Sequence, residues 1–151
     1  MFNEQPTPAP ILAILCGRTE KIASVVIPAL LPEIEVIHFI PTTSSAVSQI
    51  PALLRGETAV PSDTPFGTKN YTRGVGAIIL GAGYTDEDID AMRAVSVGEG
   101  SKGVPWIRAD TSKPTPPLGP EYGKDAVRRV KAAFEEIQDK GGLEGDGVFW
   151  Y

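Results

Sequence analysis

The stretch "ILAILCGRTEKIAS", residues 11–24, decides the fold. Its first six residues are apolar, as in a buried strand, and a Cys-Gly-Arg turn then leads to Thr19. The Thr19 hydroxyl can cap a helix, and Glu20 would then lie at the positive end of the helix dipole. A strand that ends in glycine and is followed at once by a helix N-terminus is typical of α/β proteins, which hold phosphates and carboxylates there.

The same alternation of apolar runs and helical patterns continues along the chain. We expect strands at residues 10–15, 35–40, 76–80 and 104–108. We expect helices from Thr19, from Ser44 or Ser45, from Thr85 with a capping box to Asp88, and over residues 124–139. Such alternation predicts a three-layer, Rossmann-like α/β domain. Its four-stranded parallel sheet would have the order 2-1-3-4, with helices on both faces, because crossovers are right-handed.

Composition excludes several classes of protein. A chain of 151 residues corresponds to a single domain, and its net charge of -5 without any basic run argues against nucleic acid as a partner. No apolar run approaches the ~20 residues that span a bilayer, so we expect no membrane contact and a cytoplasmic protein. Cys16 is the only cysteine and His38 the only histidine. We therefore expect no disulfide and no metal site, and a serine–histidine triad has little support.

Four segments fall outside this regular pattern. Residues 1–9 are expected to form a flexible N-terminus. Two stretches, 55–74 and 110–123, are longer than ordinary connections, which is typical of functional covers or insertions. The tail "GDGVFWY", residues 145–151, ends in three aromatic residues. We expect this tail to cover an edge of the sheet or to pack on a partner subunit in a homodimer.

A candidate ligand site follows from the predicted strand order. Ligands of doubly wound sheets bind where the order reverses, here between the first and third strands. The loops after these two strands are expected to open side by side into a shared cleft, flanked by the loops after the second and fourth strands. The candidate binding residues are Gly17, Arg18, Thr19, Thr42, Thr43, Gly81, Gly83, Tyr84, Asp110 and Lys113.

One local resemblance bears on the cofactor. The segment "GRTEKIA", Gly17 to Ala23, resembles the end of the phosphate loop and the start of the first helix in many flavodoxins. The resemblance implies FMN, with Thr19 holding its phosphate. Flavodoxins carry hydroxyl residues before the glycine, where this chain has Ile14-Leu15-Cys16. The G-x-G-x-x-G fingerprint of dinucleotide sites is also absent after the first strand. The cofactor stays unknown, with an NAD(P)-like ligand preferred over FMN.

Three functions are consistent with these residues. The first is a domain that binds a nucleotide-type or other anionic small molecule at the crevice. The second is a non-catalytic interaction protein that has lost the cofactor site. The third is a small enzyme that uses Cys16 or the edge at residues 110–113. A helix N-terminus and Arg18 would lower the pKa of the Cys16 thiol, whereas the alternative for Cys16 is a small core residue. Arg18 itself would pair with an anionic ligand, Glu20 or Asp86.

Overall fold

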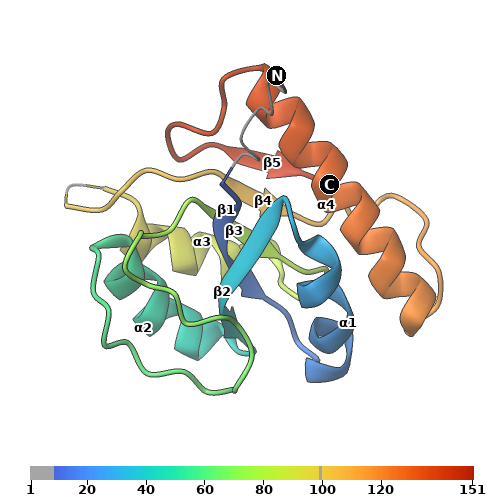
Figure 1. Cartoon of the computed structure of the whole chain (residues 1–151), viewed down its shortest axis with the longest axis horizontal. Coiled ribbons are helices and arrows are strands. Elements are labelled where there is room, and N and C mark those ends of the chain that lie inside the picture. Colours follow the sequence, from blue (N-terminus) through green and yellow to red (C-terminus); the bar gives the residue numbers. More distant parts are fainter. Residues whose placement is uncertain (1–8, 99) are drawn as a thin grey trace, which may run out of the picture.

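The computed structural model describes residues 9–98 and 100–151 as an α/β domain, with one parallel sheet between two layers of helices (Figure 1). Within these residues, no helix combines the length and the apolar content needed to cross a membrane. The strands are β1 (Ile11–Cys16), β2 (Ile34–Ile40), β3 (Ala77–Leu80), β4 (Trp106–Arg108) and β5 (Val148–Trp150). The helices are α1 (Glu20–Leu30), α2 (Thr43–Leu54), α3 (Asp86–Ser96) and α4 (Pro120–Asp139).

The sheet has five strands in the order β2-β1-β3-β4-β5, and all neighbours are parallel. The predicted fold class and the order of the first four strands are confirmed, but the predicted count of four is wrong. The fifth strand comes from the aromatic tail, where Val148 pairs with Trp106 and Trp150 with Arg108. Three residues are too few to show a strand pattern in the sequence. The expectation that the tail covers a sheet edge is confirmed.

Two helices begin earlier than the sequence predicts. Helix α2 begins at Thr43, one or two residues before the expected start, because the Thr42 side chain accepts a hydrogen bond from the Ser45 N–H and caps the helix there. Helix α4 begins at Pro120 instead of Lys124, since proline fits the first turn of a helix, where its missing N–H costs nothing. The predicted capping box of α3 is confirmed.

Alternate residues of the strands face two separate apolar cores. In β1, Leu12, Ile14 and Cys16 pack under α2 and α3, while Ala13 and Leu15 pack under α1 and α4. Both faces of the sheet are therefore covered, which explains why the strands are continuously apolar instead of alternating with polar residues.

The position of α4 is unusual. Strand β4 lies next to β3, and β5 lies next to β4 in the same direction across the sheet. If these two crossovers had the same hand, helices α3 and α4 would therefore lie on the same face of the sheet. Instead α4 packs beside α1 and α3 beside α2 (Figure 1). The last crossover therefore has the opposite hand to the other three, against a strong general preference. The chain after β4 must cross the carboxyl edge of the sheet to reach α4.

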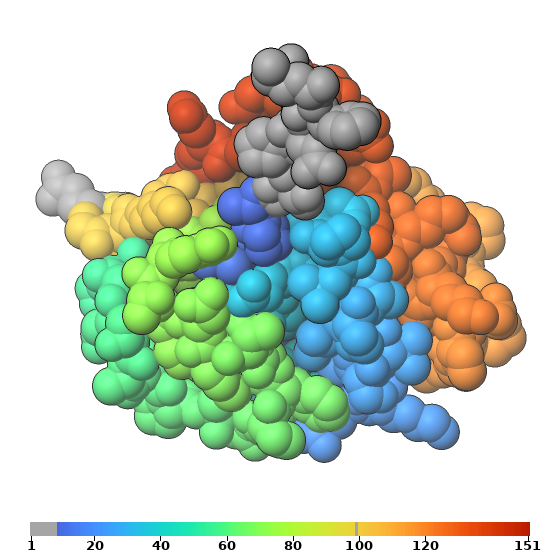
Figure 2. All heavy atoms as spheres, viewed as in Figure 1, coloured from blue at the N-terminus to red at the C-terminus, as the bar shows by residue number. Residues whose placement is uncertain are grey.

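The long loop at residues 55–74 covers the outer edge of β2. The backbone N–H groups of Thr68 and Lys69 donate to carbonyl oxygens of β2 at 3.0 and 2.9 Å. His38, buried within β2, has its Nδ1 2.7 Å from the Tyr71 hydroxyl of the same loop. Figure 2 shows the loop in green beside the cyan surface of β2. The loop thus satisfies backbone groups that an edge strand would otherwise leave open to pairing with another chain.

Candidate functional site

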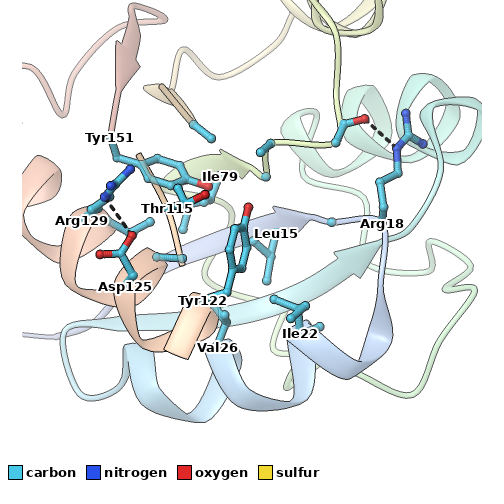
Figure 3. Close-up of a pocket in the computed structure, with 18 of the residues that line it drawn as sticks. Leu15, Arg18, Ile22, Val26, Ile79, Thr115, Tyr122, Asp125, Arg129 and Tyr151 are labelled. Atoms are coloured by element: carbon cyan, nitrogen blue, oxygen red, sulfur yellow. Dashed lines mark hydrogen bonds and ion pairs between the residues drawn. The ribbon is translucent and has the colours of Figure 1, made fainter. Parts of the chain in front are cut away.

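A cavity of about 330 Å³ lies at the carboxyl ends of β1, β3 and β4, between α1 and α4. One side is apolar and includes Leu15, Ile22, Val26 and Ile79, whereas the opposite side carries polar groups of α4 and of the segments on either side of it (Figure 3). This opposite side is formed by Thr115, Tyr122, Asp125, Arg129 and Tyr151.

The loops after β1 and β3 open side by side into this cavity, as the sequence predicts. The Gly81 N–H donates to the Cys16 carbonyl at 2.9 Å. A Cβ on Gly83 would lie 2.5 Å from the Cγ of Arg18, so the close approach of the two loops requires glycine at this position. The candidate binding residues that line the cavity are Gly17, Arg18, Thr19, Gly81, Gly83, Asp110 and Lys113, and the catalytic candidate Cys16 also borders it.

The guanidinium of Arg18 is bound within the protein. Its Nε donates to the Gly83 carbonyl at 3.1 Å, and its Nη2 donates to the Thr43 hydroxyl at 3.0 Å and to the Asp88 carboxylate at 3.2 Å. The group also lies 3.9 Å from the centre of the Tyr84 ring. In Figure 3 it extends away from the other labelled side chains of the cavity. Arg18 therefore joins the loop after β1 to the loop after β3 and to the starts of α2 and α3.

The expected ion-pair partners of Arg18 were Glu20 and Asp86, and the structure corrects this to Asp88. Asp86 pairs instead with Arg108, at 2.5 Å. The reason is the capping box of α3: the Asp88 carboxylate bends back to accept from the Thr85 N–H at 2.9 Å, which places it beside Arg18. These hydrogen bonds hold the pKa of Asp88 below its usual value.

Three candidate residues lie outside the cavity, on the side of α2 and α3. Thr42 caps α2, and Thr43 accepts the hydrogen bond from Arg18. Tyr84 is buried, and its hydroxyl donates to the Ile40 carbonyl at 3.1 Å. Burial raises the pKa of Tyr84, so the phenol stays protonated and can keep this bond. The hydrogen bonds of these side chains shape the loops that border the cavity.

The thiol of Cys16 does not have the environment expected of a nucleophile. Its side chain belongs to the apolar core under α2 and α3. Burial raises the pKa of Cys16 to about 12, and the nearby charge of Arg18 lowers it by less. The lowered pKa considered for a nucleophile is therefore wrong, because loss of solvation outweighs the neighbouring cation, and the alternative of a small core residue is confirmed. The thiol is protonated at neutral pH.

An ion pair on α4 forms a wall of the cavity that sequence reasoning missed. The Asp125 carboxylate is buried and lies 3.1 Å from Nε of Arg129, and it also pairs with Arg128. Nη2 of Arg129 donates to the Pro114 carbonyl, which ties α4 to the segment that follows β4. The spacing of four residues between Asp125 and Arg129 is that of a helical ion pair, and this signal could have been found.

Two tyrosines complete this wall. The Tyr151 hydroxyl is buried and donates to the Leu80 carbonyl at 3.1 Å, and burial raises its pKa. Tyr122 is half-buried, and its ring lies on the cavity wall opposite Leu15 (Figure 3). Tyr122 was missed because residues 120–123 were assigned to a loop, and Tyr151 because only the fold of the tail brings it under α4.

Residues 110–113 form a polar part of the rim. The Asp110 carboxylate accepts from the Ser112 N–H at 3.0 Å and from its hydroxyl at 2.6 Å, which lowers the pKa of Asp110. Lys113 is exposed and forms no ion pair with the residues that the structure describes. Its ammonium group is thus available to a ligand.

Comparison with known proteins shows the family to which the chain belongs. Kojic acid related protein 6 from Aspergillus oryzae is 41% identical over 145 residues, which cover 93% of this chain and 86% of that protein. The chain belongs to this family. No family model and no solved structure matches it.

Proposed function

We propose that this protein binds an anionic small molecule in the cavity between α1 and α4. The observation that carries the proposal is the cavity itself. It lies where the winding of the sheet reverses, which is the usual ligand site of open α/β sheets, and it is lined by an apolar side and a polar rim.

The volume favours a compact ligand. Small-molecule pockets range from about 300 to 1,000 Å³, and this cavity of about 330 Å³ is at the lower end. A single ring or a mononucleotide portion matches that size better than a complete dinucleotide. The apolar residues of β1, β3 and α1 would hold the body of the ligand. Burial of ~100 Å² of apolar ligand surface there would contribute about 2.5 kcal/mol.

The charge of the ligand follows from Lys113. Arg18 and Arg129 already bind protein acceptors, whereas Lys113 at the rim lacks an ion pair with any described residue. A carboxylate or phosphate at the rim would pair with this ammonium group, and the N-terminal end of α1 beside Thr19 adds a favourable dipole. Because Lys113 is exposed, salt will weaken this contribution.

A binding screen by thermal shift and calorimetry tests the proposal. The panel contains NADP, NAD, FMN, mononucleotides and compact aromatic carboxylates. Kojic acid joins the panel because the name of the Aspergillus oryzae relative refers to it. We expect at least one compact anion to raise the melting temperature and to bind with a stoichiometry of one. If no member of the panel binds, the proposal is wrong.

Two pairs of variants locate the binding. Ala126→Phe places a ring in the cavity and should abolish binding, while Ala132→Phe on the exposed face of the same helix should not. Lys113→Ala should weaken binding of the anion by about tenfold. This is the loss of affinity expected when one hydrogen bond to a charged group, partly screened by solvent, is removed. Lys124→Ala, which removes an exposed lysine that has an ion pair on α4, is the matched control. If the two variants of a pair bind the ligand with equal affinity, the ligand does not lie at the cavity residue that the pair tests.

A homodimer through the β5 edge is proposed as a second property. Trp150 on this edge strand is 55% exposed, and such an edge can pair with a second copy. We expect light scattering to give the mass of a dimer for the wild type and of a monomer for Trp150→Ala. A wild-type monomer at micromolar concentration would exclude the dimer.

A further inference from the structure

Three hydroxyl groups lie on the polar side of the cavity between α1 and α4. They belong to Thr115, Tyr122 and Tyr151, whose side chains converge on one part of the cavity in Figure 3. Hydroxyl groups recognise a ligand by its hydrogen-bonding atoms and not by its net charge. They therefore restrict the ligand in a way that Lys113 at the rim does not.

The hydroxyl of Tyr122 is open to a ligand. The hydroxyls of the other three tyrosines, Tyr71, Tyr84 and Tyr151, all form hydrogen bonds. The Tyr122 hydroxyl forms none with the residues that the structure describes, and it is not among their buried unpaired atoms, so its oxygen is accessible. Because Tyr122 lines the cavity, this hydroxyl can donate a hydrogen bond to a bound molecule or accept one from it.

Thr115 is held at the same part of the cavity through the residue before it. Arg129, whose Nε lies 3.1 Å from the Asp125 carboxylate, donates from Nη2 to the carbonyl of Pro114. The next residue, Thr115, is exposed and lines the cavity. Its hydroxyl thus adds a second group that can both donate and accept.

The Tyr151 hydroxyl beside Tyr122 favours a ligand hydroxyl over a carboxylate at this position. It donates to the Leu80 carbonyl at 3.1 Å, so only the lone pairs of its oxygen remain. Burial, and next the neighbouring Tyr122, raise the pKa of Tyr151, so the phenol keeps its proton at neutral pH. A carboxylate oxygen has no proton to donate to these lone pairs, whereas a hydroxyl has one.

The aromatic residues of the cavity favour a flat ring as the body of the ligand. Phe39, Tyr122 and Tyr151 are among its lining residues, and aromatic rings pack well on one another in stacked or edge-to-face arrangements. Resting on the binding function proposed above, we infer that the ligand is a hydroxylated aromatic carboxylate. Its ring lies between α1 and α4, its ring hydroxyl contacts Tyr122 and Thr115, and its carboxylate lies at the rim beside Lys113.

Calorimetric titration with matched ligands tests this inference. The probes are meta- and para-hydroxybenzoate and the two corresponding fluorobenzoates, which have nearly the same size and charge but no O–H group. We expect at least one hydroxybenzoate to bind the wild type about tenfold more tightly than its fluorobenzoate, which is the gain from one hydrogen bond away from bulk solvent. This comparison needs no variant of the protein.

A pair of variants then locates the group that recognises the ligand hydroxyl. Tyr122→Phe removes only an oxygen atom, so the hydroxybenzoate should lose its advantage while the affinity for the fluorobenzoate stays at the wild-type value. Tyr71→Phe makes the same change in the loop at residues 55–74, outside the cavity, and should keep the tenfold difference.

Each of the other outcomes overturns the inference. Equal affinities of the wild type for hydroxybenzoates and fluorobenzoates would do so, and would leave the proposed function standing because an anion still binds. A tenfold preference that persists in Tyr122→Phe would show that the hydroxyl is recognised elsewhere. If none of the four probes binds, the inference fails alone when another member of the screen binds, and fails together with the proposed function when none does.

Discussion

The buried thiol of Cys16 yields the sharpest prediction. Burial raises its pKa from the ordinary value of 9.0 to about 12. At a pH below both pKa values, each increase of 1 in pKa lowers the fraction of thiolate tenfold, and the pKa of Cys16 increases by about 3. At pH 8 the folded protein therefore has about 1,000-fold less thiolate than the unfolded chain. Because the thiolate is the form that reacts, alkylation of the native protein should be slower by at least this factor.

The assay is alkylation with iodoacetamide followed by intact-mass measurement, on native protein and on protein unfolded in urea. We expect the unfolded chain to react fully before the native protein shows any modification. Native labelling should still be increasing with pH at about pH 10, above the ordinary thiol pKa of 9.0, while the protein remains folded. Cys16→Ala provides the control for modification of other side chains.

A specific result would refute this reasoning. Native alkylation at a rate within about tenfold of the unfolded rate, with a plateau below pH 8, would show a thiolate stabilised by Arg18 and the start of α1. That outcome would restore Cys16 as a candidate nucleophile and would favour the enzyme among the three functions considered from the sequence.

Three further predictions concern stability. Arg18→Ala removes the contacts to Gly83, Thr43 and Asp88, and it should lower the free energy of unfolding in urea titrations by roughly 1–2 kcal/mol. Its control is Arg55→Ala, which removes a solvent-exposed ion pair and should change the free energy of unfolding by less than about 0.5 kcal/mol. The pKa of Asp88 is lowered in the folded state, so its stabilisation is present above its unfolded pKa and is lost as pH falls through the folded pKa. Between about pH 5 and pH 2, wild type should lose more stability than Asp88→Asn; parallel pH curves would contradict this. Tyr151→Phe removes the buried hydrogen bond to Leu80 and should cost about 1 kcal/mol by thermal unfolding; an unchanged melting temperature would show that the bond contributes nothing.

Local signals in the sequence determined much of the fold. The continuous apolar runs of β1 and β3, the Thr19 cap and the capping box from Thr85 to Asp88 act over a few residues, and the structure has each of them. Their order along the chain was enough to predict the parallel sheet and the meeting of the loops after β1 and β3. Seven candidate residues consequently lie at one cavity.

The polar wall of that cavity depends on the position of helix α4, which no local sequence pattern predicts. Helix α4 could be recognised from its apolar stripe, but only tertiary packing places it beside α1 through a crossover of the less common hand. This placement brings Tyr122, Asp125 and Arg129 to the site. The short strand β5 was invisible for the same reason, since its three residues become a strand only by pairing with β4.

The sequence by itself determined the four helices, the first four strands and which loops meet at the carboxyl edge, because caps, turns and apolar periodicity are properties of neighbouring residues. The tertiary structure decided which side chains remain available there. From the sequence, Arg18 was expected to pair with an anionic ligand, Glu20 or Asp86, yet Gly83, Thr43 and Asp88 bind its guanidinium. Hydrogen bonds and burial arise from residues far apart in the chain, so only the folded protein shows that Arg18 is bound internally while Lys113 remains available.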